Sequence, residues 1–128
     1  MMLKEGGEII AHRVELADTF LKKVRGLMLR RLFADTALIF LFERPAVIRI
    51  HMLFVLFPID LLFLDESMRI LDLTTLKPFI GYKSSRVPVS FAVELPAGTI
   101  KRCGLKKGDK IEITGLTQGF SPQEHLAP

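Results

Sequence analysis

Four ionisable side chains are the residues of this sequence most able to do chemistry: Arg25, His51, Asp60 and Glu94. Asp60 follows Pro58 within a run that is otherwise apolar. A buried carboxylate is costly unless it is paired, hydrogen-bonded or protonated. We therefore expect Asp60 either to cap the turn at Pro58 or to meet a cation.

His51 is also embedded in apolar residues, and a histidine oriented by a carboxylate is a common general base. Pairing of His51 with Asp60 would give such a group, although a histidine with a purely structural role is the simpler interpretation. Glu94 alternates with the Val and Phe side chains of residues 87–95, so it points away from their face, toward solvent, a pocket or the core.

Several kinds of chemistry have no support in the sequence. There is no glycine-rich phosphate loop and no nucleophile elbow. His12, His51 and His125 are far apart, so we expect neither a metal site nor a cofactor. Cys103 is the single cysteine; its basic neighbours would lower its pKa, but a small, buried or half-buried thiol without a catalytic role is the favoured interpretation.

The elements that must position these residues are mostly short strands. Residues 18–30 have apolar side chains at helical spacing and predict one amphipathic helix, with Gly26 opposite the apolar stripe. Thr99–Cys103 predicts one helical turn and residues 75–86 a loop. Strands are predicted at 8–16, 37–43, 47–57, 59–65, 68–76, 87–95 and 110–114. We therefore expect an α+β, β-rich domain with a small, barrel-like, mostly antiparallel sheet.

Composition indicates one globular domain. The chain has 128 residues, 49% of them hydrophobic, and a net charge of +4. We expect a single domain over 1–128, with a polar tail at 116–128. We also expect a cytoplasmic protein, because no export signal or membrane span is visible and only one cysteine is present. The absence of Asn and the presence of only two Gln favour a thermophilic source.

Motifs in a fixed order along the chain resemble the domain of unknown function 192, a family of small bacterial and archaeal domains. The resemblance covers about residues 9–114 and implies a compact, β-rich α+β fold with no established activity. The motif positions carried over are Arg25, Gly26, Met28, His51, Met52, Pro58, Asp60, Glu94 and Gly98. This chain departs from the family pattern at Leu53-Phe54-Val55, which are apolar where many relatives have Lys-Asn-Thr.

These observations leave four hypotheses open. In the first, Arg25, His51, Asp60 and Glu94 converge at one end of the barrel and bind a small polar or anionic ligand. In the second, the His51–Asp60 pair belongs to a hydrolase-like enzyme. In the third, the chain is a structural or interaction protein whose basic helix contacts a protein or nucleic acid. Nucleic acid is the less favoured partner, because few aromatic residues are available to stack on bases. In the fourth, the same four residues form a buried network that stabilises the fold. No membrane partner is expected.

Overall fold

The computed structural model describes residues 2–17, 35–51, 57–78 and 80–114 of the chain. The strands are β1 (Met2–Glu5), β2 (Glu8–Ala11), β3 (Arg13–Ala17), β4 (Thr36–Ala46), β5 (Arg49–His51), β6 (Ile59–Leu64), β7 (Ile70–Leu76), β8 (Tyr82–Ser84), β9 (Val89–Pro96) and β10 (Ile111–Thr114). The described helix, α2, is Thr99–Cys103. The amphipathic helix predicted at 18–30, with Arg25, Gly26 and Met28, lies outside the described residues, as do Met52 and the tail at 116–128.

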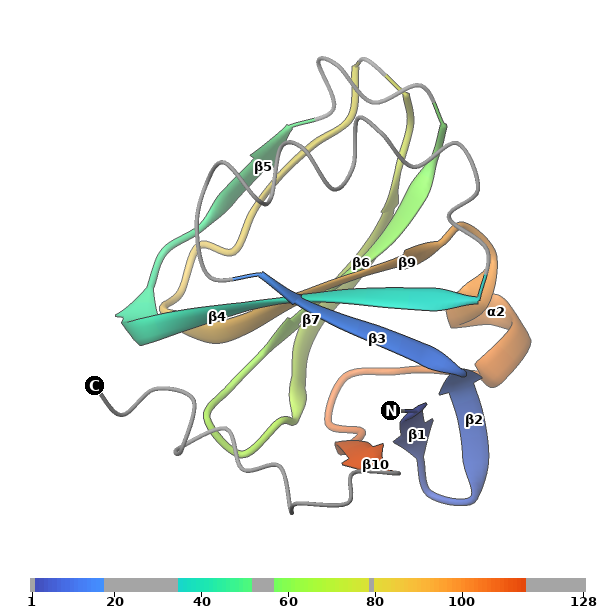
Figure 1. Cartoon of the computed structure of the whole chain (residues 1–128). Helices are drawn as coiled ribbons and strands as arrows, with labels where there is room; N and C mark the ends of the chain where they lie inside the picture. Colours follow the sequence, from blue (N-terminus) through green and yellow to red (C-terminus); the bar gives the residue numbers. More distant parts are fainter. Residues whose placement is uncertain (1, 18–34, 52–56, 79, 115–128) are drawn as a thin grey trace.

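A five-stranded sheet in the order β3-β4-β9-β6-β7 forms the centre of the molecule (Figure 1). Its strands are antiparallel except for β3 and β4, which run parallel. Two smaller sheets complete the described fold, with the orders β10-β1-β2 and β5-β8. The α+β, β-rich class predicted from sequence is confirmed. Within the described ranges, however, the strands form three separate sheets and not a closed barrel.

Both faces of the central sheet are covered, which explains why β4, β6 and β9 consist of nearly continuous apolar residues. On one face, Leu62, Leu64 and Val93 pack with residues of β1, β2 and β10; we call this the first face. On the other, second face, Leu61 and Phe63 pack with Ile50 of β5. Figure 1 shows the same division, because β5 lies on the opposite side of the central strands from β1, β2 and β10.

Several turns agree with the sequence prediction, two predicted elements need correction, and one strand is missing from the prediction. The turn at Asp65–Ser67, the turn at Ala97–Gly98 and the helical turn Thr99–Cys103 are present as expected. The strand predicted at 8–16 is divided at His12 into β2 and β3. The predicted loop at 75–86 contains the end of β7 and all of β8. β1 was not predicted, because its four residues, Met-Leu-Lys-Glu, are too few and too polar to show a clear period.

Two motif positions have local structural explanations. Gly98, the residue that precedes α2, has a φ of +95°. In this left-handed conformation a residue with a side chain is strained. Pro58 immediately precedes β6, the usual place for a residue that cannot donate a backbone hydrogen bond inside a sheet. None of the helices among the described residues has the length and apolar character needed to cross a membrane.

Candidate functional site

Asp60 is fully buried, and its carboxylate is used inside the fold. One oxygen accepts a hydrogen bond from the Thr75 hydroxyl at 2.6 Å, and the other accepts one from the Ile100 backbone N–H at 2.8 Å. Ile100 lies in the first turn of α2, whose N-cap residue, Gly98, has no side chain to accept a hydrogen bond. Asp60 therefore replaces the missing N-cap of α2, although it is 40 residues from Ile100 in sequence. The contacts of Asp60 in the described structure are neither with the turn at Pro58 nor with a cation, so both predictions for this residue need correction.

Glu94 is also fully buried, but it points to the opposite side of the sheet from Asp60. In the β6–β9 register Glu94 pairs with Leu61, whereas Asp60 pairs with Leu95. Paired residues share a face and successive residues alternate, so Glu94 lies on the second face and Asp60 on the first. The prediction that Asp60 and Glu94 converge in one polar pocket is therefore wrong, because the sheet separates their side chains.

His51, in contrast, is placed by its backbone alone. His51 belongs to β5, which lies on the second face through Ile50, whereas Asp60 points to the first face toward α2. The side chain of His51 lies outside the described part of the structure, so the pairing of His51 with Asp60 stays a prediction. Arg25, the fourth member of the expected cluster, lies outside the described residues.

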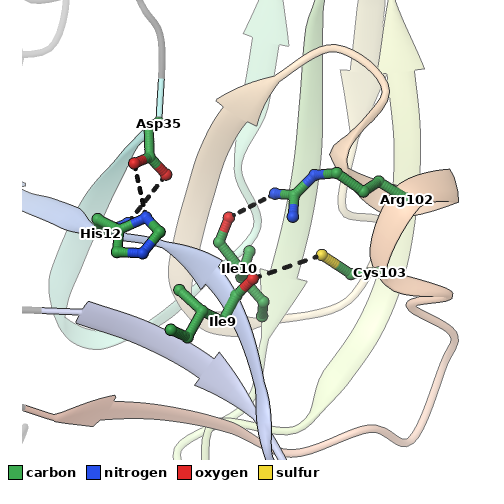
Figure 2. Close-up of polar contacts among 6 residues, drawn as sticks. All are labelled: Ile9, Ile10, His12, Asp35, Arg102 and Cys103. Carbon is green, nitrogen blue, oxygen red and sulfur yellow. Dashed lines mark hydrogen bonds and ion pairs between the residues drawn. The ribbon is translucent and has the colours of Figure 1, made fainter.

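A different histidine–aspartate pair is present at the entry to the parallel strands (Figure 2). His12 Nδ1 and Asp35 Oδ2 are 2.7 Å apart, and Asp35 Oδ1 accepts the His12 backbone N–H at 3.0 Å. These hydrogen bonds to His12 lower the pKa of Asp35, although its slight burial acts in the other direction. Both side chains are at least half exposed. The pair fastens the first residues of β3 to those of β4, since the Arg13 N–H also donates to the Asp35 carbonyl at 3.2 Å.

Sequence reasoning missed this pair because the two residues are 23 positions apart and His12 looked like part of one continuous strand. The available signal was Asp35 itself, which has a φ of +54° and directly precedes an apolar strand. Aspartate tolerates the left-handed conformation better than most residues and often binds nearby backbone groups.

Cys103, which belongs to α2, lies near the His12–Asp35 pair (Figure 2). Figure 2 shows its thiol directed at the Ile9 carbonyl, 3.9 Å away, while the neighbouring Arg102 guanidinium donates to the Ile10 carbonyl at 2.8 Å. Burial raises the pKa of Cys103 more than the nearby Arg102 charge lowers it. The expected lowering of this pKa is therefore wrong, whereas the expected half-buried thiol is confirmed. The described residues also contain no cluster of metal-ligating side chains.

A two-stranded ribbon made of β5 and β8 carries the most unusual surface among the described residues. Arg49 pairs with Ser84, Ile50 with Lys83, and His51 with Tyr82. Ile50 is buried in the second face, and Lys83 beside it reaches Asp72 of β7 at 2.9 Å. By alternation, the side chains of Arg49 and Tyr82 share the outer side of this ribbon.

Ser85 fixes one end of the ribbon. Its hydroxyl accepts the Ile48 N–H at 3.0 Å and donates to the Val87 carbonyl at 2.7 Å, while its own N–H donates to the Ile48 carbonyl at 2.8 Å. Val47 and Val87 are consequently held at this end and are about half exposed. At the other end Ile80 is 78% exposed and Tyr82 is 57% exposed. We call the surface formed by Val47, Arg49, Ile80, Tyr82, Arg86 and Val87 the ribbon face.

Comparison with known proteins places the chain among proteins without an established activity. A relative from the archaeon Thermococcus kodakarensis, a UPF0127 protein, is 39% identical over 80% of this chain and 65% of its own length. A UPF0127 protein from Pyrococcus abyssi is 38% identical over 78% of this chain and 85% of its own length. This chain therefore aligns with slightly less than two thirds of the Thermococcus protein. Both genera are thermophilic, in keeping with the amide-poor composition.

Two crystal structures share the fold. A Sinorhizobium meliloti protein described as a "putative transcription regulator" superposes with a TM-score of 0.71 at 34% identity, covering 77% of this chain and 79% of that one. A Novosphingobium aromaticivorans protein of unknown function gives 0.69 at 28% identity, covering 78% and 74%. The model of the family DUF192, described as an uncharacterized ACR, matches residues 1–113. The resemblance noted in the sequence is thus confirmed, and the chain belongs to the DUF192 family.

Proposed function

We propose that this chain is a binding module for an anionic partner and that it binds through the basic residues on and around the ribbon face. The observation that carries the proposal is the charge of the two segments that form the ribbon. Residues 44–51 and 77–88 contain no Asp or Glu, and their basic residues are Arg44, Arg49, Lys77, Lys83 and Arg86. Four of these are exposed, and Lys83 is the one engaged with Asp72.

The pairing of β5 with β8 matters because it gathers charges that are far apart in sequence. Arg49 and Arg86 are 37 residues apart, yet Arg49 pairs with Ser84, two residues before Arg86. Like charges held together repel one another, and an anion relieves that repulsion. The anionic ligand expected from sequence is retained in this proposal, but its site moves from a polar pocket to an exposed surface.

The contacts of Asp60 support this change of site. A carboxylate that already accepts two hydrogen bonds from the protein serves the fold and does not need a ligand to satisfy it. Glu94 is buried on the second face behind the strands, so neither carboxylate competes with the anion at the ribbon face.

Retention on heparin, a soluble polyanion, tests the proposal. The double variant Arg49→Glu/Arg86→Glu reverses two exposed charges of the ribbon face, and Lys101→Glu reverses one exposed charge on α2 as a control. We expect wild type and the control to elute at similar salt concentrations and the double variant to elute at a much lower one. The reason is that each lost contact between an arginine and an anionic group of heparin weakens binding.

Reversal of the basic segment predicted at 18–30 tests the competing location. If Lys22→Glu/Lys23→Glu abolishes retention while Arg49→Glu/Arg86→Glu does not, the ribbon face is not the binding surface. If wild type passes through heparin at low salt, the proposal of an anionic partner fails altogether. Far-UV circular dichroism and the unfolding midpoint of each variant exclude misfolding as the cause.

We also propose that the protein acts in a reducing compartment such as the cytoplasm. Support comes from Cys103, the single cysteine of the sequence, which is a free thiol. Mass measurement of the protein isolated from its native cells tests this. An unmodified thiol is expected, and a disulfide-linked dimer would contradict the assignment.

A further inference from the structure

The large hydrophobic side chains that are exposed among the described residues all lie in β8 or in the segments that directly flank β5 and β8. They are Val47, Ile80, Tyr82 and Val87. Comparable side chains in the rest of the described structure are at least partly covered by the two faces of the central sheet. Single exposed apolar residues are ordinary, but a group of them on one element is typical of an interaction surface.

The backbone around Ile80 holds this side chain in water. The Ile80 N–H donates to the Pro78 carbonyl at 2.7 Å, and the Gly81 N–H donates to the Lys77 carbonyl at 3.0 Å. A Cβ at Gly81 would lie 2.6 Å from the Lys77 oxygen, so the turn closes only because residue 81 is glycine. The most exposed apolar side chain is thus presented by a tight, specific turn and not by a loosely held loop.

The chemistry of the group favours one class of anionic partner. Three of the four side chains are aliphatic and β-branched, and aliphatic groups cannot stack on nucleic-acid bases. Aliphatic groups that project from a surface are stabilised at the boundary between lipid headgroups and acyl chains. Tyrosine is enriched at the same boundary, and nearby Arg and Lys attract anionic headgroups.

We propose that the ribbon face docks on an anionic lipid surface, with Ile80 and Val87 entering the interface and Arg49 and Arg86 contacting headgroup phosphates. This inference rests on the proposed function and names its partner. It departs from the sequence-based expectation of no membrane partner, which concerned spanning segments; docking on a surface needs no span.

Vesicle binding tests the inference, and the protein supplies its own reporter. Tyr82 is the only tyrosine and the chain has no tryptophan, so tyrosine emission reports on the ribbon face alone. We expect wild type to sediment with phosphatidylcholine vesicles that contain about 30% phosphatidylserine and to remain in solution with pure phosphatidylcholine vesicles. On binding, acrylamide should quench the Tyr82 emission less, because the ring leaves bulk water.

Matched variants separate the apolar contribution from the charge. Ile80→Ser/Val87→Ser removes two exposed aliphatic side chains and should weaken binding to anionic vesicles by about tenfold or more, with unchanged retention on heparin. Ile80→Leu/Val87→Leu keeps apolar side chains at both positions and should retain vesicle binding. Both positions are about half exposed or more, so the folded state should tolerate either pair of changes.

The outcomes that overturn the inference differ from those that overturn the proposed function. Wild type that binds heparin but not anionic vesicles leaves the anionic partner standing and refutes the lipid surface. Equal vesicle binding by the serine variant also refutes it, as does stronger binding to single-stranded DNA than to vesicles at equal salt. Failure of wild type to bind heparin at low salt refutes the proposed function itself.

Discussion

At the scale of single residues, two sets of polar side chains in this protein connect neighbouring elements of the fold, one buried and one exposed. Asp60 links three elements, because it lies on β6 and accepts hydrogen bonds from Thr75 of β7 and from the first turn of α2. The His12–Asp35 pair similarly joins β2 and β3 to the start of β4. Chemistry that looks catalytic in the sequence is therefore structural in these contacts.

Replacement of Asp60 tests this structural role. Asp60→Ala should lower the free energy of unfolding by about 3 kcal/mol, because it deletes two hydrogen bonds and leaves a cavity at a fully buried position. Asp60→Asn keeps the volume and one acceptor oxygen, so it should cost less. Urea unfolding of both variants measures the difference, and an alanine variant as stable as wild type would show that the two contacts contribute nothing.

The lowered pKa of Asp35 predicts how stability depends on pH. A carboxyl group whose pKa is lower in the folded state stabilises the fold above its unfolded pKa and loses that contribution as pH falls through the folded value. Asp35→Asn, which also tolerates the left-handed backbone, should thus be less stable than wild type near neutral pH, and the difference should shrink below about pH 4. Unfolding midpoints of both proteins, measured at about five pH values from 3 to 7, test this. A stability difference between wild type and Asp35→Asn that grows on acidification would contradict the prediction.

At the scale of elements, the β5–β8 ribbon is attached to the second face at a small number of points. Ile50 packs beneath it, Ser85 closes one end, and Lys83 reaches Asp72 of edge strand β7. Burial alone would raise the pKa of Asp72, but the hydrogen bonds from Lys83 and the Leu73 backbone, together with the charges of Lys83 and Lys107, outweigh burial and lower it. The outer side of the ribbon, in contrast, is left with exposed Arg49 and Tyr82.

The turn that connects β7 to the ribbon gives a prediction for this element. Gly81→Ala should destabilise the protein by about 2 kcal/mol, since its Cβ would overlap with the backbone of Lys77. Gly7→Ala is the control, because a Cβ at Gly7 meets no atom within 4 Å and the residue has no positive φ. Thermal unfolding compares the two, and equal midpoints would mean that the turn relaxes freely.

At the scale of the whole molecule, the central sheet has an apolar layer packed on each of its two faces. Leu61 and Leu62 are neighbours in sequence and both fully buried, yet they belong to the second and first faces respectively. A sheet with one solvent-exposed face would bury only one of them. This arrangement also explains why two carboxylates close together in the β6–β9 register, Asp60 and Glu94, are not neighbours in space on one face.

Truncation on each face tests whether both layers stabilise the fold. Leu61→Ala and Leu62→Ala should each lower the free energy of unfolding by about 3 kcal/mol, because each leaves a cavity in a packed layer. Val47→Ala, at a site that is 46% exposed, should change it by less than about 0.5 kcal/mol. Urea unfolding provides the measurement, and a small effect for either leucine would indicate that its face is loosely packed.

Local patterns in the sequence determined much of the strand content of this protein. Runs such as Ile59–Leu64 are apolar throughout because both sides of the strand are buried, and turns such as Ala97–Gly98 depend on residues with special backbone freedom. The family was also recognisable from short motifs in order. These features depend on residues near one another in the chain, which is why they can be predicted without coordinates.

Only the tertiary structure decided which polar residues meet. Asp60 finds its partners 15 and 40 positions away, and His12 finds Asp35 at a distance of 23 positions. The face on which a side chain points depends on strand register, and a shift of one residue reverses it. For that reason the sequence could identify Asp60 and Glu94 as buried polar residues, but the register of β6 against β9 was needed to show that the sheet lies between them.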